Sequence, residues 1–169
     1  MSPLIATEKK HQDKIIAELE AEAIDFFVRF MSMLGLSRSV GEIYGLLYIS
    51  QEPLNMDDIV QRLGLSSGSA SQGLKSLRSL KAVQVTYQMG ERKDYYVAEY
   101  EFRKIIGSFF KEEIVPQLEV AGAKVGKMQE TADSIQDEEV QSFYSNRLSR
   151  LKRFHKAAKT LLPALAKIM

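Results

Sequence analysis

Ten polar or basic residues near the middle of the chain have side chains suited to binding an anionic polymer. Eight of them fall within residues 66–80, a stretch without a single acid, and two follow in a later loop. Hydroxyl, amide and cationic groups bond to phosphates and to the edges of bases. The ten residues are Ser66, Ser67, Ser69, Ser71, Gln72, Lys75, Ser76, Arg78, Arg92 and Lys93. This set predicts contact with double-stranded DNA.

The element that must position the first eight is an amphipathic helix over residues 66–80. Ser66 has the side chain of an N-cap, and the apolar residues recur at spacings of 4, 3 and 3, so one face is buried. These apolar residues are Ala70, Leu74, Leu77 and Leu80. The polar and basic residues then share the opposite, solvent-facing side.

A shorter helix precedes it, beginning after Asn55. Asn55 is a favourable N-cap, and Asp57 and Asp58 suit the positive end of a helix. Gly64 can adopt the left-handed conformation that ends a helix without strain. The two helices and their tight turn predict a helix-turn-helix.

Two short strands, 83–88 and 95–99, are expected after the second helix. Val83, Val85 and Tyr87 alternate with polar residues, which is the period of a half-buried strand. Gly90 permits a tight bend, so Arg92 and Lys93 lie near the tip of a hairpin. A helix-turn-helix followed by a basic hairpin is a winged helix, whose wing can place a cation against a neighbouring groove.

Charge is distributed unevenly along the chain. The formal net charge is only +1, but residues 62–94 contain six Lys or Arg and two acids, for a net charge of +4. The remaining residues contain 17 basic and 20 acidic side chains, for a net charge of −3. A basic patch that coincides with a winged helix favours DNA over an ordinary charged surface.

Three runs of residues form a recognisable pattern: Gly35-Leu36-Ser37-Arg38-Ser39-Val40-Gly41-Glu42-Ile43-Tyr44-Gly45, Leu65-Ser66 and Gly90-Glu91-Arg92-Lys93-Asp94-Tyr95-Tyr96. Together they resemble the GbsR-like branch of the MarR-type transcriptional regulators. The likeness covers roughly residues 10–110, and the first run is the most specific. Gly90 stands where the wider MarR pattern Asp-x-Arg has its Asp, while Arg92 is kept.

The resemblance also implies a small-molecule effector, because some GbsR-like regulators respond to choline-type osmolytes. Aromatic rings can hold a quaternary ammonium group. Candidate rings are Phe102, Phe109, Phe110, Tyr144 and Phe154. Their helical spacing favours core packing, so we assign no effector site.

The N-terminal part is expected to be a loose tail over residues 1–7 and a long helix over 8–34. Its apolar stripe has nearly heptad spacing and comprises Ile16, Leu19, Ala23, Phe26, Phe30 and Met33. Such a helix can pack on its own domain or also on a second copy, and the wide Phe-rich stripe favours a second copy. A capping box at Ser39 and Glu42 predicts the next helix, over 40–50. Arg38 can contact a phosphate or brace an acid, and bracing is favoured.

Two further helices are expected after the wing. Pro116 must kink or restart the first, over 101–129, because proline lacks a backbone donor and clashes with the preceding turn. A boundary at Ser134 to Asp137 precedes the last helix, over 138–162. The apolar residues of this last helix, from Tyr144 to Met169, form another apolar stripe. The stripe is wider than one packed helix would cover.

These expectations divide the chain into three parts. Residues 1–34 form a tail and dimerisation helix, 35–100 the winged helix-turn-helix, and 101–169 a helical dimerisation and effector region. The predicted fold is therefore mostly α, with a two-stranded β-hairpin wing and long flanking dimerisation helices.

Other chemistry has little support in the residues. The chain has no Cys and two His, and no catalytic triad, phosphate loop or zinc spacing is recognisable. We expect no enzymatic activity, cofactor or metal, and no membrane span, which favours the cytoplasm. His155 lies on an apolar seam, where an interface role is favoured over a pH switch. A basic run over 147–159 is either an anion-binding surface or, as we favour, paired with the acids of residues 130–139 in the same or another chain.

The predicted function is a homodimeric DNA-binding transcriptional regulator, with repression the favoured outcome. Helix 66–80 would read the major groove of a pseudo-palindromic operator, and wing 88–95 would lie at the minor groove. The alternative is a winged-helix module that binds a protein, although such a face would usually be apolar or acidic. A small hydrolase or transferase is a remoter alternative.

Overall fold

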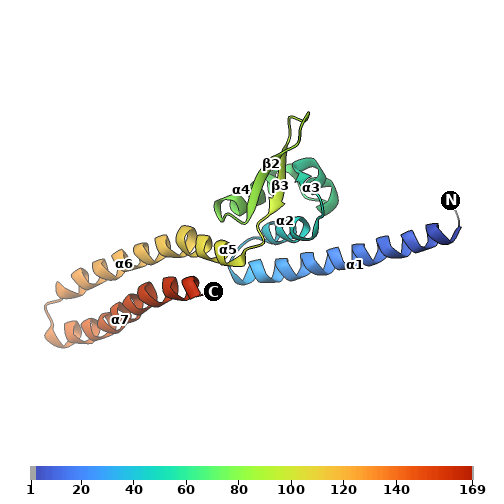
Figure 1. Ribbon diagram of the computed structural model, residues 1–169. Helices are drawn as coiled ribbons and strands as arrows, with labels where there is room; N and C mark the ends of the chain where they lie inside the picture. The colour runs from blue at the N-terminus through green and yellow to red at the C-terminus, as the bar shows by residue number, and fades with distance from the viewer. Residues whose placement is uncertain (1–2, 169) are drawn as a thin grey trace. The chain divides into compact units, whose positions relative to one another are not determined.

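The computed structural model of the chain describes residues 3–168 (Figure 1). The chain divides into two units, and the boundary between them in the sequence follows Glu101. The first unit contains α1, Pro3–Met33; α2, Arg38–Ile49; β1, Leu54–Asn55; α3, Met56–Leu63; α4, Ser67–Ser79; β2, Val83–Tyr87; and β3, Asp94–Ala98. The second contains α5, Phe102–Phe109; the π-helical turn η1, Phe110–Ile114; α6, Val115–Asp133; and α7, Glu138–Ile168. A mostly helical winged helix-turn-helix is confirmed (Figure 1).

The sheet of the first unit has three antiparallel strands in the order β1-β3-β2. The predicted hairpin is present, with Val83 opposite Ala98 and Tyr87 opposite Asp94. The sequence did not predict β1, whose residues Leu54 and Asn55 pair with β3. This pairing bonds the central strand on both sides at the base of the wing.

Two predictions at the start of helices are wrong. The first helix begins at Pro3, so the expected loose tail is helical from that residue onward. The expected capping box at Ser39 is absent, because α2 begins at Arg38 with Ser37 as its N-cap. Glu42 instead accepts a hydrogen bond from Nε of Arg38 at 2.7 Å, so Arg38 braces an acid as the sequence favoured.

Helices α1 and α2 approach each other at two glycines of α2. A Cβ atom added at Gly41 would lie 2.5 Å from the Cα of Val28, and one added at Gly45 would lie 2.7 Å from the Cα of Ile24. Both distances are far below van der Waals contact between carbon atoms. The Gly-x-x-x-Gly spacing of the family-like motif therefore allows the two backbones to touch.

The two sides of α1 differ in burial. Phe27 and Met31 are buried in the first unit, where Phe27 packs edge-on against Tyr44. Leu19, Phe26 and other members of the predicted stripe remain exposed, with Phe26 at 61%. The core of this unit therefore uses the side of α1 opposite most of the predicted stripe.

In the second unit, α6 and α7 run side by side in opposite directions (Figure 1). The π-helical turn η1 ends just before Pro116, which confirms the predicted interruption, because a widened turn accommodates a residue that cannot donate. The predicted boundary is also confirmed, since Oδ1 of Asp137 accepts from the Val140 amide at 3.0 Å and caps α7.

His155 joins the two long helices of the second unit. Its Nε2 donates to the carbonyl of Leu118 at 2.7 Å, and a Cβ at Gly122 would lie 2.8 Å from the ring. His155 is half-buried at this contact. It therefore holds α7 against α6 within one chain.

Within residues 3–168, no helix combines the length and apolar character needed to cross a membrane.

We expect Gly45→Ala to lower the free energy of unfolding by about 1–3 kcal/mol, because its Cβ would meet backbone rather than a flexible side chain. Urea unfolding followed by circular dichroism measures this. Gly68→Ala in α4 is the matched control: its nearest contact would be 3.9 Å away, so stability should hold or rise. Equal unfolding midpoints for Gly45→Ala and the unaltered chain would contradict the close helix contact.

Candidate nucleic-acid interface

The turn that positions α4 is built from Gly64 and Ser66, as predicted. Gly64 adopts the left-handed conformation, with φ of 65°. The Ser66 side chain accepts a hydrogen bond from the Ser69 amide at 3.1 Å and donates to the Ser69 hydroxyl at 3.0 Å. The start of α4 is therefore held by local bonds.

One face of α4 is buried and the other is open to solvent. The buried residues are Ala70, Gly73, Leu74 and Leu77. All ten residues of the predicted DNA-binding set are exposed except Ser76, which is half-buried. The structure thus gathers the eight predicted residues of this helix on its accessible side. Ser66 differs from the others because its hydroxyl is occupied by the helix cap.

Helix α4 ends in a turn whose left-handed residue is Lys81. Lys81 has a left-handed backbone with φ of 54°, and the Ala82 amide donates to the Leu77 carbonyl at 2.8 Å. Lysine in this conformation is uncommon, and it favours the negative end of a helix. Lys81 counted only toward net charge in the sequence, yet it is an exposed cation directly after the C-terminus of α4.

A shallow hollow of about 290 Å³ lies between α4, α3 and β3. Ser71, Lys75 and Arg78 line its α4 side, while Met56 and Tyr96 line the other. Burial raises the pKa of the Tyr96 hydroxyl, which therefore remains a neutral phenol at physiological pH. Sequence reasoning missed Met56 and Tyr96, since apolar and aromatic residues in these elements are usually core.

The N-terminus of α3 meets the wing through Lys93. Asn55 caps this helix as predicted, since its side chain accepts from the amides of Asp57 at 2.9 Å and Asp58 at 3.1 Å. Asp58 completes a capping box by accepting from the Asn55 amide at 3.0 Å. Nζ of Lys93 donates to Asp57 at 2.8 Å, and this bond raises the pKa of Lys93. Lys93 is thus exposed but already paired.

Arg92 lies in the wing loop, next to Lys93 but in a different setting. Gly90 provides the bend, with φ of 88°, and the Tyr95 hydroxyl donates to Glu91, which raises the pKa of Tyr95. Within residues 3–168, Arg92 makes no hydrogen bond or ion pair with another side chain. Figure 1 shows the loop between β2 and β3 extending beyond the helices of this unit. The Arg92 guanidinium is therefore free to reach a ligand.

Four of the six Lys and Arg side chains in residues 62–94 make no ion pair with another described residue. Arg62 pairs with Glu20 of α1, and Lys93 pairs with Asp57. The other four make no ion pair among the residues that the structure covers; they are Lys75, Arg78, Lys81 and Arg92. In the same described part of the chain, no cluster of three or more His, Cys, Asp or Glu residues is placed to hold a metal ion. The arrangement is thus a polar, cationic helix face beside an arginine-bearing loop.

Curated proteins of Bacillus subtilis (strain 168) resemble this chain. It is 38% identical over 87 residues to the HTH-type transcriptional repressor GbsR, covering 52% of this chain and 48% of GbsR. The resemblance to GbsR-like regulators is confirmed. The HTH-type transcriptional repressor OpcR is 24% identical to this chain over 102 residues, covering 60% of the chain and 55% of OpcR.

A third relative is the putative HTH-type transcriptional regulator YvaV, 23% identical over 96 residues, with 57% and 54% coverage of the two chains. The chain thus spans about half the length of the curated relatives it matches. No protein-family model matches it. A crystal structure of a transcriptional regulator shares its fold, with a TM-score of 0.57 at 17% identity over 89% of this chain and 95% of that one.

We expect Ser66→Ala to lower the free energy of unfolding by about 1 kcal/mol, because it removes the cap of α4. Ser66→Asp should keep most of that stability, since a carboxylate also accepts from the helix amides and suits the positive helix end. Thermal unfolding of the two variants measures the difference. Equal losses of stability would show that the Ser66 cap contributes little.

Proposed function

We propose that this chain is a homodimeric DNA-binding transcriptional regulator that represses its target genes. The observation that carries the proposal is the exposed polar face of α4 beside the wing: within residues 3–168, Lys75 and Arg78 of α4 and Arg92 of the wing make no ion pair. Its resemblance to HTH-type repressors supports the same function. Residues 35–100 would be the DNA-binding region, with 1–34 and 101–169 serving dimerisation and effector response.

The exposed face of α4 enters the major groove in this proposal. Gln72 can bridge the two adenine groups that the major groove presents. The serines and Lys75 would bond to phosphates and set the register of the helix on the duplex. In a dimer, two such helices about 34 Å apart reach successive major grooves of a pseudo-palindrome.

The wing supplies the second contact. Arg92 would enter or flank the minor groove, where a narrow A-tract carries enhanced negative potential. Lys93 would reach the DNA backbone only by exchanging Asp57 for a phosphate. Binding of DNA would therefore require Lys93, but not the adjacent Arg92, to break an existing ion pair.

The first test is fluorescence anisotropy with duplex DNA from the region upstream of the chain's own gene, with random duplex as competitor, at two salt concentrations. A specific regulator binds the cognate duplex despite the competitor and loses affinity steeply as salt rises. Selection from a random-sequence library extends the test to operators elsewhere. Failure to enrich any sequence would contradict the proposal and favour a protein-binding winged helix.

Arg92→Ala should weaken DNA binding about 5- to 30-fold and reduce the salt dependence by about one counterion, because one unpaired cation leaves the interface. Its unfolding transition should not change, since Arg92 bonds to no other described side chain. Lys93→Ala should have a smaller effect, because Lys93 is already paired with Asp57. Unaltered affinity in Arg92→Ala would exclude Arg92 from the interface.

Gln72→Ala should relax the preference for adenine at one operator position, with a loss of about 1–3 kcal/mol in discrimination. Sequence selection with the variant and the unaltered protein measures this. Lys75→Ala is the contrasting variant, since loss of a phosphate contact should weaken all sequences alike. An unchanged selection profile in Gln72→Ala would show that Gln72 does not read a base.

A further inference from the structure

Tyr96 is a buried residue whose hydroxyl has no partner within the described chain. It lies in β3 and is only 8% exposed. Among residues 3–168 its hydroxyl makes no hydrogen bond, which distinguishes it from the hydroxyls of Tyr44 and Tyr95. In the same residues, no polar side-chain atom is both enclosed and without a hydrogen-bond partner. The Tyr96 hydroxyl therefore opens onto the hollow of about 290 Å³ that its side chain lines.

The backbone of β3 holds this hydroxyl in place. Tyr96 lies opposite Leu54 of β1 and Val85 of β2, so its strand is paired on both sides. The adjacent Tyr95 points to the other face of the sheet, because successive side chains of a strand alternate. The Tyr95 hydroxyl is already engaged, since it donates to Glu91. Of the two adjacent tyrosines, Tyr96 is thus the one that presents its donor to the hollow.

Two cations and a second hydroxyl line the hollow from α4. They belong to Ser71, Lys75 and Arg78, whose spacings of 4 and 3 place them on one side of the helix. All three residues are exposed, and Lys75 and Arg78 form no ion pair with any residue from 3 to 168. Burial raises the pKa of Tyr96, and the positive charge of Arg78 partly offsets this rise, so the guanidinium lies near the phenol.

The acids of the neighbouring elements are engaged or lie outside the lining of the hollow. Asp57 is bound to Lys93, and Asp58 closes the cap of α3. Asp94 raises the pKa of Tyr96, after the larger effect of burial, but it does not line the hollow. The phenol stays protonated and can donate. With two cations and no acid among its described lining residues, the hollow attracts an anion.

The size and the donors of the hollow indicate which anion it can hold. About 290 Å³ exceeds the roughly 30 Å³ of a water molecule and lies just under the roughly 300 Å³ at which small-molecule pockets begin. A guanidinium donates to phosphate through two parallel N–H groups, while an ammonium acts as a point charge. A guanidinium, an ammonium and two hydroxyls therefore match the oxygens of a single phosphate group.

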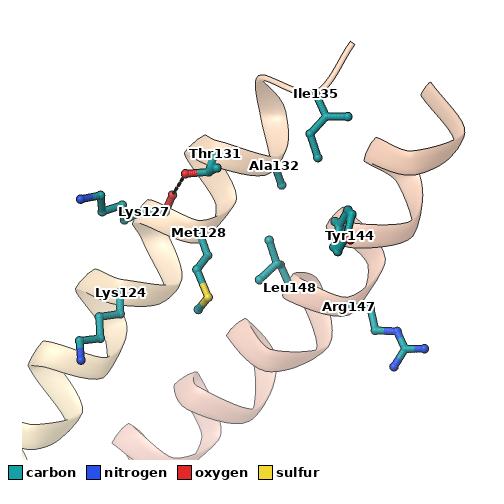
Figure 2. Close-up of a pocket in the computed structure, with 9 residues that line it drawn as sticks. All are labelled: Lys124, Lys127, Met128, Thr131, Ala132, Ile135, Tyr144, Arg147 and Leu148. Carbon is teal, nitrogen blue, oxygen red and sulfur yellow. Dashed lines mark hydrogen bonds between the residues drawn. The ribbon is translucent and has the colours of Figure 1, made fainter. Parts of the chain in front are cut away.

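The larger groove between α6 and α7, of about 640 Å³, does not gather its cations in this way. Its floor is apolar and includes Met128 and Tyr144 (Figure 2). Lys124 and Lys127 lie along one side and Arg147 along the other, and in Figure 2 the two sets point away from each other. Divergent cations would not hold one small anion well, because its charge would need them to converge.

The basic run over 147–159 on α7 also lacks such a site. Its expected pairing with the acids of residues 130–139 is absent within the described part of the chain, where Lys159 alone of this run forms an ion pair, with Glu119 at 2.6 Å. No residue of the run is buried, and Phe154, for which spacing favoured a core role, is 73% exposed. The run therefore has no fixed donor of the kind that β3 provides.

We propose that the hollow binds one phosphate of the DNA backbone, with the Tyr96 hydroxyl as a fixed donor. This inference rests on the proposed DNA-binding function and specifies how α4 is positioned. Arg78 and Lys75 supply the positive charge, and the Ser71 hydroxyl adds a further donor. Phosphate contacts fix the register of a protein on the duplex without reading its sequence. The site therefore sets where Gln72 of α4 meets a base.

The fixed position of Tyr96 gives it a role that a surface cation does not have. Exposed lysine and arginine side chains must be ordered when they bind, which costs conformational freedom. A buried phenol on a strand paired on both sides is already ordered. Tyr96 thus orients the backbone phosphate, whereas Lys75 and Arg78 mainly attract it.

Tyr96→Phe tests the site, because it keeps the ring and removes only the hydroxyl. Fluorescence anisotropy with the selected operator duplex should show about 10-fold weaker binding, since a hydrogen bond to a charged acceptor is lost. The unfolding midpoint should not change, because the hydroxyl bonds to no described residue. Tyr95→Phe is the matched control, which removes the neighbouring hydroxyl on the other face of the sheet.

Operator duplexes with a single uncharged methylphosphonate at each backbone position locate the phosphate. At one position the unaltered chain should lose affinity, and Tyr96→Phe should lose nothing further there while remaining about 10-fold weaker at every other position. Any effect of Tyr95→Phe should be the same on all duplexes. Calorimetric titration with inorganic phosphate tests the other source of this chemistry. Binding of inorganic phosphate that Tyr96→Phe abolishes, without any effect on DNA affinity, would overturn the assignment to the DNA backbone.

The outcomes separate this inference from the proposed function. Equal operator affinity of Tyr96→Phe and the unaltered chain, or a loss that no methylphosphonate position cancels, would overturn the phosphate site while leaving a DNA-binding regulator intact. A chain that enriches no sequence from a random library would overturn both. A loss that is cancelled at one backbone position would support both.

Discussion

The close contact between α1 and α2 at Gly41 and Gly45 supports the arrangement of the whole first unit. With α2 held against the α1 backbone, Ile43 packs on α4 at Gly73, where an added Cβ would lie 2.5 Å from Cδ1 of Ile43. Tyr44 reaches the other side of the unit, donating its hydroxyl proton to the Glu99 carbonyl at 2.7 Å. Burial raises the pKa of Tyr44, so it remains a donor at physiological pH. One helix therefore connects the long helix, α4 and the strand end.

The sequence predicted those parts of the fold that local chemistry determines. Asn55, Gly64 and Ser66 each act within a few residues of their own position, so the helix-turn-helix followed from caps and periodicity. The strand β1 did not, because two residues have no periodicity and form a strand only when β3 is beside them. The capping box expected at Ser39 and Glu42 is likewise absent, because the Glu42 carboxylate accepts a hydrogen bond from Arg38 instead.

In the candidate site, too, features set by local sequence could be predicted, whereas contacts between distant elements could not. Exposure of the α4 face followed from its apolar spacing, but the spacing could not show which cations are already paired. Lys93 and Arg92 are adjacent in sequence, yet only Lys93 meets an acid, because Asp57 is brought to it by the cap of a distant helix. On α1, Phe26 is exposed while the neighbouring Phe27 is buried, and periodicity alone could not assign the side that contacts α2. Pairing across elements is therefore what sequence reasoning lacked.

The three-stranded sheet has a consequence for motion in the wing. Its base, at Tyr95 and Tyr96, is bonded to a strand on each side, whereas its tip beyond Tyr87 and Asp94 is a loop with no ladder. Local opening costs least where backbone bonds are few and exposed. Amide hydrogen exchange should thus be slow at the base and fast at the tip. Arg92 therefore lies on the part of the hairpin that opens most easily, so the wing tip can change conformation while the three paired strands hold its base.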